Sequence, residues 1–159
     1  MERYALLCYT RSRRNTSRIT MERFLYFRTE ATDANDDATG DSACFPASSL
    51  MGMQPTADSV LTLYFKSMVR RTPSGNEADD QVNFDNHDRV ALNLTTANTH
   101  LTAMQAITHA IATGVIFGSN ATVPILIIVA NDDSGGTEYL SGSGIANCAG
   151  ISVQIAYDN

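Results

Sequence analysis

Cysteine is scarce in this chain of 159 residues. The three cysteines, Cys8, Cys44 and Cys148, are an odd number without paired spacing. That arrangement fits neither a disulfide framework nor a C-x-x-C metal site. We therefore expect each to be a small buried apolar side chain, in a protein that folds in a reducing cytoplasm.

Long apolar runs are also missing. The longest, Val123 to Ala130, has the length of a strand and includes Pro124, whereas a membrane span needs about 20 apolar residues. The sequence therefore predicts a soluble protein without a membrane segment. Its length and its 43% hydrophobic residues predict a single domain with a sizeable core.

The sequence contains none of the common catalytic or nucleotide-binding motifs. There is no Walker A sequence, no G-x-S-x-G and no H-E-x-x-H. The stretch "GSGIANCAG" is not a dinucleotide-binding G-x-G-x-x-G, because Asn147 occupies the third glycine position and a strand follows it. We expect no cofactor and no catalytic residues.

Positive charge is concentrated at the start of the chain. Residues 1–20 hold five arginines and one acidic residue, a net charge of +4, so with −6 for the whole chain residues 21–159 carry −10. So acidic a body repels nucleic acid. Residues 1–20 are either an upstream extension of the reading frame or a basic arm that orders against an acidic neighbour. The folded domain is expected to span 21–159.

Alternating apolar residues, together with one run that is apolar on both faces, 122–130, predict a sheet of about five strands. The strands are expected over residues 22–28, 59–70, 89–95, 122–130 and 151–158. The polar stretches 29–41 and 71–87 have no periodicity and are expected to be long loops. Between them, residues 50–53 are expected as a short apolar patch, with turns at Gly52 and Pro55.

Residues 98–113 have the period of an α-helix. Five residues form its predicted buried stripe, with Ala103 and Ala110 beside it: Leu101, Met104, Ile107, Thr108 and Ile111. The fold class is therefore α+β, with a mixed sheet, this helix on one face and long polar loops. The strand at 89–95, the helix and the strand at 122–130 are expected to form a right-handed parallel crossover.

One helix covers only one face of such a sheet. The other face is expected to be covered by the long loops and by another subunit. Its candidate interface residues are Tyr26, Val60, Tyr64 and Lys66. Lys66 also opens the basic segment 66–71, which suits either an anionic partner or the protection of a strand edge.

Two acidic stretches are weak candidates for a calcium site. In the first, Asp33, Asn35 and Asp37 match positions one, three and five of a calcium-binding loop. The match fails at positions six and twelve, which hold Ala38 and Cys44 instead of glycine and glutamate. The second is the turn with Asp132 and Asp133, which follows the predicted strand 122–130. A solvated acidic loop is the plainer interpretation of both.

The three histidines do not form a predicted site. His100 and His109 are nine residues apart, about 180° around the helix, so they cannot share a metal. His100 is expected to be a buried, hydrogen-bonded structural residue. His87, between Asp85 and Asp88, suits an acid–base role or plain exposure, and no serine or cysteine nucleophile can be assigned to it.

A resemblance covers nearly all of residues 21–159. The run from "MERFLYFRTEATDANDDATGD" through "CFPASSLMGMQPTADSVLTLYFKSM" and "DRVALNLTTANTHLTAMQAI" to "IANCAGISVQIAYDN" resembles small virion structural proteins of tailed phages of marine cyanobacteria and other marine bacteria. The resemblance implies a start near Met21 and a non-enzymatic component of the particle, such as a capsid decoration or cement protein, made in the bacterial cytoplasm. The implied partners are copies of itself and other virion proteins.

Two alternatives stay open beside this interpretation. A small acidic ligand- or calcium-binding module would use the acidic loops as its site. A small hydrolase would use His87 and nearby carboxylates, provided that they converge on a pocket.

Overall fold

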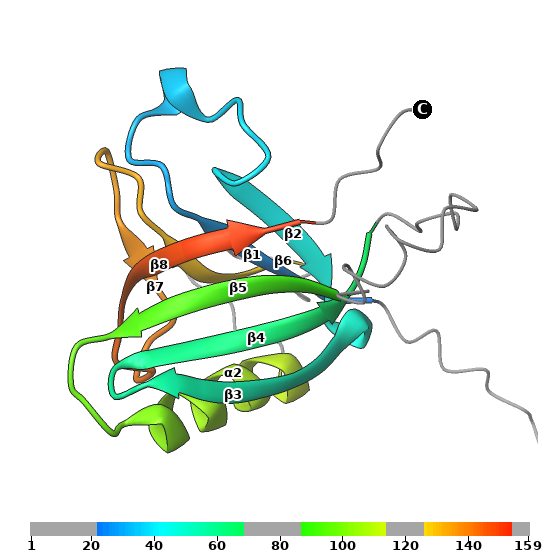
Figure 1. Cartoon of the computed structure of the whole chain (residues 1–159), viewed down its shortest axis with the longest axis vertical. Coiled ribbons are helices and arrows are strands. Elements are labelled where there is room, and N and C mark those ends of the chain that lie inside the picture. Colours follow the sequence, from blue (N-terminus) through cyan, green and yellow to red (C-terminus); the bar gives the residue numbers. More distant parts are fainter. Residues whose placement is uncertain (1–21, 69–86, 114–125, 154–159) are drawn as a thin grey trace, which may run out of the picture.

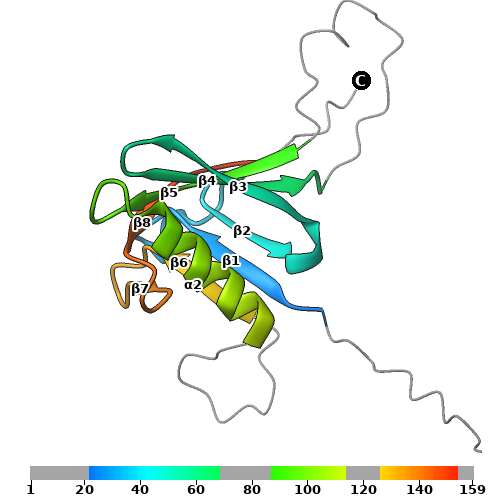
Figure 2. The same cartoon turned by 90° about the horizontal axis from the view of Figure 1, so that it is seen from below.

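The protein folds as two four-stranded sheets and one main helix (Figures 1 and 2). The computed structural model describes residues 22–68, 87–113 and 126–153. The mixed sheet has the strand order β2 (Ser42–Pro46), β1 (Phe24–Arg28), β6 (Leu126–Asn131), β7 (Glu138–Tyr139). The antiparallel sheet has the order β3 (Leu50–Ala57), β4 (Val60–Lys66), β5 (His87–Leu94), β8 (Ile145–Ser152). The helix is α2 (His100–Thr113), and two 3-10 turns are η1 (Asp33–Asn35) and η2 (Ala47–Ser49).

The predicted α+β class and the main helix are confirmed, although the strands form two sheets instead of one. The alternation in the sequence does set the buried faces. In β4 the inward residues Leu61, Leu63 and Phe65 are fully buried, and in β5 every second residue is buried. The basic segment 1–20 lies outside the described residues. In the part of the chain that is described, no helix is long and apolar enough to span a membrane.

The prediction that the strands at 89–95 and 122–130 form a parallel crossover in one sheet is wrong. Strands β5 and β6 belong to different sheets, and α2 carries the chain from one sheet to the other. The parallel neighbour of β6 is β1, the first strand of the chain. The helix contacts β4 and β6 and so closes one side of the space between the sheets (Figure 2).

Three strands, β2, β3 and β7, were missed because they lie in stretches rich in turn residues such as glycine and proline. Strand β3 runs through both Gly52 and Pro55, and its register with β4 is irregular at two places, Leu50/Gly52 and Pro55/Ala57. It lies at the edge of its sheet, where a proline costs no hydrogen bond with a further strand. The last strand also differs, because β8 begins six residues before the expected 151, and residues 154–158 fall outside the described part.

Three phenylalanines join the two sheets. Phe27 and Phe45 come from the mixed sheet and Phe65 from the antiparallel one, and all three are fully buried. The rings of Phe45 and Phe65 stack with their centroids 4.2 Å apart. Phe27 meets Phe65 edge-on at 5.9 Å. Burying each ring contributes about 2 kcal/mol of transfer free energy, so this cluster is a main part of the contact between the sheets.

The helix turns a slightly different face to the core than its apolar pattern predicts. Ala103, Ile107 and Ala110 are buried, whereas Leu101 is 67% exposed and Thr108 is exposed too. Small alanines allow the helix to approach the sheets closely. The predicted stripe therefore had the right period and was rotated from the true one.

This rotation can be tested by truncating one residue from each face. Ile107→Ala should lower the free energy of unfolding by about 2–5 kcal/mol, because it leaves a cavity in the core. Leu101→Ala should change it by no more than about 0.5 kcal/mol. Urea unfolding of the two variants measures both values, and similar losses would contradict the observed orientation of α2.

Candidate functional site

Two acidic segments lie side by side at one edge of the mixed sheet. Loop 29–41 follows β1 and the turn 131–137 follows β6. Because β1 and β6 are parallel neighbours, their carboxyl ends meet at the same edge. The amide of Ser134 donates to the carbonyl of Ala31 at 2.8 Å, which ties the segments together. We call loop 29–41 and segment 131–138 together the acidic loops.

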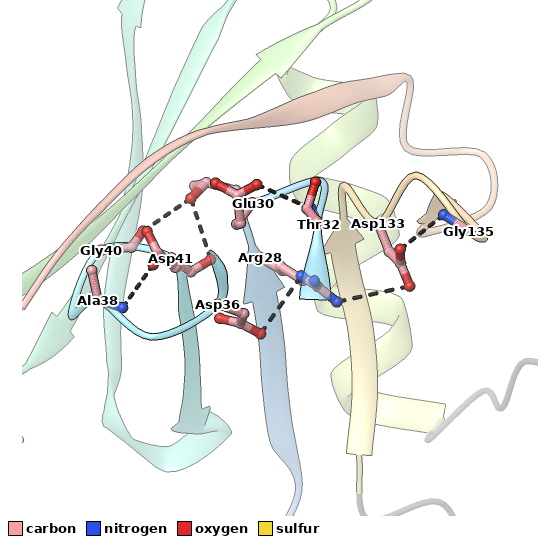
Figure 3. Close-up of polar contacts among 10 residues, drawn as sticks. Arg28, Glu30, Thr32, Asp36, Ala38, Gly40, Asp41, Asp133 and Gly135 are labelled. Carbon is pink, nitrogen blue, oxygen red and sulfur yellow. Dashed lines mark hydrogen bonds and ion pairs between the residues drawn. The ribbon is translucent and has the colours of Figure 1, made fainter. Parts of the chain in front are cut away.

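Arg28, the last residue of β1, lies between the acidic loops (Figure 3). It is only 6% exposed. Its Nε lies 3.6 Å from a carboxylate oxygen of Asp36, and its Nη1 lies 3.7 Å from one of Asp133. The two carboxylates offset part of the cost of burying the guanidinium charge, and removing it would leave the acidic groups facing one another.

Backbone and side-chain bonds fold loop 29–41 upon itself (Figure 3). The amide of Thr29 donates to the Asp41 carbonyl at 2.8 Å, and the Thr29 hydroxyl also donates to carbonyls of Gly40 and Asp41. The Asp41 carboxylate accepts from the Ala38 amide at 2.7 Å, and Glu30 accepts from the Thr32 amide. These carboxylates therefore shape the loop in which they lie.

Two of the candidate calcium residues, Asp132 and Asp133, bind other groups of the protein. Asp132 accepts from the Tyr139 hydroxyl at 2.8 Å through one oxygen and from the Cys148 amide at 3.0 Å through the other. Asp133 accepts from the Gly135 amide at 2.8 Å and faces Arg28. Among the described residues, no group of three or more His, Cys, Asp or Glu is placed to hold a metal ion.

The remaining three residues of that prediction lie in and beside η1. Asp33 and Asn35 bound this turn, and Asn35 and Asp37 are exposed. The loop directs Asp36, which the calcium pattern skips, toward Arg28 instead. The calcium pattern did not point to this pair, and the contact of Arg28 with Asp133 depends on the distant pairing of β1 with β6.

Two tyrosines near the acidic loops have raised pKa values. Burial, and then the hydrogen bond to the Asp132 carboxylate, raise the pKa of Tyr139 to about 12. Burial and the nearby charge of Asp36 also raise the pKa of Tyr26. Both phenols therefore stay neutral at physiological pH.

The histidines lie apart and have separate contacts. The ring of His87 lies against Tyr64, with centroids 5.2 Å apart, on the outside of the antiparallel sheet. The Nε2 of His100 is 3.0 Å from the carbonyl oxygen of Ala57, so this half-buried residue links the start of α2 to the end of β3. His109 is exposed on the helix.

The four predicted interface residues belong to two surfaces. Val60, Tyr64 and Lys66 lie on the outer face of the antiparallel sheet, alternating with the buried residues of β4. Tyr26 lies on the outer face of the mixed sheet, next to Cys44 and Ile128 in register. This second face is apolar, and the sequence alone could not assemble it because its residues come from three strands: Phe24, Tyr26, Cys44, Leu126 and Ile128.

The sequence predicted that the long loops help to cover the face of the sheet opposite the helix. Loop 29–41 does not lie over the outer face of the antiparallel sheet. It lies against the turn after β6 instead, because of the Ser134 to Ala31 hydrogen bond and the Arg28 contacts. Of the other predicted loop, 71–87, only His87 is described, and it is part of β5. Figures 1 and 2 show no described helix or strand over this face.

Comparison with family models, with curated proteins and with solved structures finds no match for the chain.

The role of Arg28 can be tested by Arg28→Met, which keeps the length of the side chain and removes its charge. We expect the free energy of unfolding to fall by about 2 kcal/mol, less than for a fully buried pair because both carboxylates keep contact with water. Amide exchange at Ser134 should quicken, because the acidic loops separate. Lys66→Met, at an exposed position, is the control, and equal effects of the two changes would refute the role of Arg28.

The two described cysteines differ in exposure. Cys148 is buried, as expected, and burial raises its pKa to about 12. Cys44 is exposed, contrary to the prediction, because the alternation of β2 turns Ala43 and Phe45 inward. Partial burial still raises the pKa of Cys44.

Alkylation should separate these thiols, because only the thiolate reacts. At pH 8 in the native protein, iodoacetamide should modify Cys44 and leave Cys148 almost unmodified; in urea both should react. Peptide mass spectrometry measures each site. Rapid native modification of Cys148 would contradict its burial.

Proposed function

We propose that this chain is a non-enzymatic structural protein that associates with copies of itself. It is of the kind that its sequence resembles, a decoration or cement component of a phage virion, made in the cytoplasm of a bacterial host. Other virion proteins are its further partners. Such a protein needs a rigid core and exposed surfaces that another subunit can cover.

The observation that carries the proposal is the edge strand β3. None of its eight residues, Leu50–Ala57, is charged, and six of them are exposed, including Met51 at 53%. Natural proteins usually protect an edge strand with charged residues, because its free backbone groups pair with other chains. Here only Pro55 and the irregular register modify the edge. An uncharged edge of this length favours contact with another subunit.

The outer face of the antiparallel sheet, which no described helix or strand covers, supports the same proposal. Its strands β4 and β5 carry small or neutral side chains at several outward positions, such as Val60, Ala91 and Asn93. A face with such side chains can pack against a second protein surface. The calcium-module alternative gains less support, because Asp132 and Asp133 already bind protein groups. The hydrolase alternative gains less too, because His87 lies against a tyrosine.

The first test is the mass of the full chain in solution, measured by light scattering after gel filtration. We expect a discrete oligomer at micromolar concentration. Met51→Lys should shift it toward the monomer, because a charge at the edge must lose water when β3 pairs. Ala112→Lys, at an exposed position of the helix, is the matched control. A clean monomer at all concentrations would refute self-association.

A further inference from the structure

Strand β3 is the outermost strand of the antiparallel sheet, and among the described strands it pairs only with β4 (Figures 1 and 2). Contacts within the chain mark both ends of its free edge. The amide of Leu50 donates to the carbonyl of Ala47, and the carbonyl oxygen of Ala57 lies 3.0 Å from Nε2 of His100. The part of the edge that is open to another chain is therefore 51–56.

The middle of this edge is its most regular part. Between the two irregular places of the β3–β4 register, residues 52–55 pair one by one with β4. Met53 packs against the core, so the next residue, Gln54, faces the outer side of the sheet, where it is exposed. The hydroxyls of Thr56 and Thr62 are 2.9 Å apart and hold the end of the edge on β4. A strand held in this way loses little conformational entropy when a partner pairs with it.

The row of residues that begins at Gln54 carries no charge. In register, Gln54 lies opposite Thr62, Thr62 opposite Ala91, and Ala91 opposite Gly150. Strand β3 has no charged residue either. When a strand pairs with a copy of itself, a charge near the centre faces the same charge, which destabilises the pair. An edge without charge meets this condition of self-pairing, whereas an edge that binds a different partner is free of it.

We propose that β3 pairs with β3 of a second copy, antiparallel and about a two-fold axis that passes beside Gln54. The inference rests on the proposed self-association and names the strand, the partner and the symmetry of the contact. A two-fold axis perpendicular to the sheet keeps the outer faces of both copies on the same side. The two four-stranded sheets thereby become one continuous antiparallel sheet. Such a contact is isologous and closed, so it gives a dimer.

The side chain of Gln54 suits a position on the axis. Its amide both donates and accepts hydrogen bonds, so the two Gln54 side chains of the dimer can bond with each other. Pro55, which has no N–H, then lies off the axis and opposite Met53 of the second copy. It costs each copy no more than one hydrogen bond of the new strand pair. Addition of a strand to a free edge obtains its affinity from the remaining backbone bonds.

The first test measures the dissociation constant of the dimer by analytical ultracentrifugation, for the full chain with Gln54→Lys and with Gln54→Glu. Each charge faces itself across the axis, so each variant alone should dissociate at least about tenfold more readily. Mixed in equal amounts, the two variants should restore the dimer, because lysine then faces glutamate. The matched controls are Gln105→Lys and Gln105→Glu at an exposed position of α2, which should stay within about twofold of the wild type.

A disulfide scan then locates the axis. Directly opposite residues of an antiparallel pair have Cα atoms about 4.5–5.5 Å apart, a separation that a disulfide can span. In a Cys8→Ser/Cys44→Ser background, Gln54→Cys should therefore form a disulfide-linked dimer under mild oxidation. Gly52→Cys and Thr56→Cys, off the axis on the same strand, should cross-link far less. A Cβ atom at Gly52 meets no atom within 4 Å, so the strand accommodates that change.

The outcomes separate this inference from the proposed function. If the wild type is a monomer, both fail; if it forms an oligomer that the Gln54 variants leave unchanged, this contact is wrong and the proposed function stands. If only one of the two charges weakens the oligomer, β3 meets a charged surface of another kind instead of its own copy. Weakening by both charges without recovery on mixing would also refute the two-fold contact. Thermal unfolding checks that each variant is folded, and the disulfide scan decides if a charged variant is not.

Discussion

The parallel pairing of β1 with β6 is the constraint on which most of the structure depends. It joins the first described strand to one that comes about a hundred residues later, so the mixed sheet forms only when distant parts of the chain meet. It requires a long connection that passes through the other sheet and through α2. It also places the carboxyl ends of both strands at one edge, and this alone brings the two acidic segments together.

Arg28 makes that meeting of acidic segments stable. Carboxylates gathered in one place repel each other unless a cation lies among them. Here the cation is a side chain of β1, so the sheet holds it in place between the acidic loops. Since the oxygens of Asp132 and Asp133 are used to bind the Tyr139 hydroxyl, backbone amides and Arg28, these carboxylates act as structural groups. The loops thereby acquire a fixed shape while keeping a strongly negative surface.

The sequence predicted local structure well and distant pairing poorly. The alternation in β4 and β5 identified their buried residues, because the period of a strand decides which side chains turn inward. No local pattern could show that β6 pairs with β1 or that β3 continues through Gly52 and Pro55. For the same reason Asp132 and Asp133 could be proposed as polar residues after a strand, while the contact of Asp133 with Arg28 could not.

The same topology leaves two surfaces open among the described residues. The outer face of the antiparallel sheet is covered by no described helix or strand (Figures 1 and 2). The edge strand β3, Leu50–Ala57, holds no charged residue, and six of its residues are exposed. Because the free backbone groups of an edge strand can pair with another chain, the proposed self-association depends most on this edge.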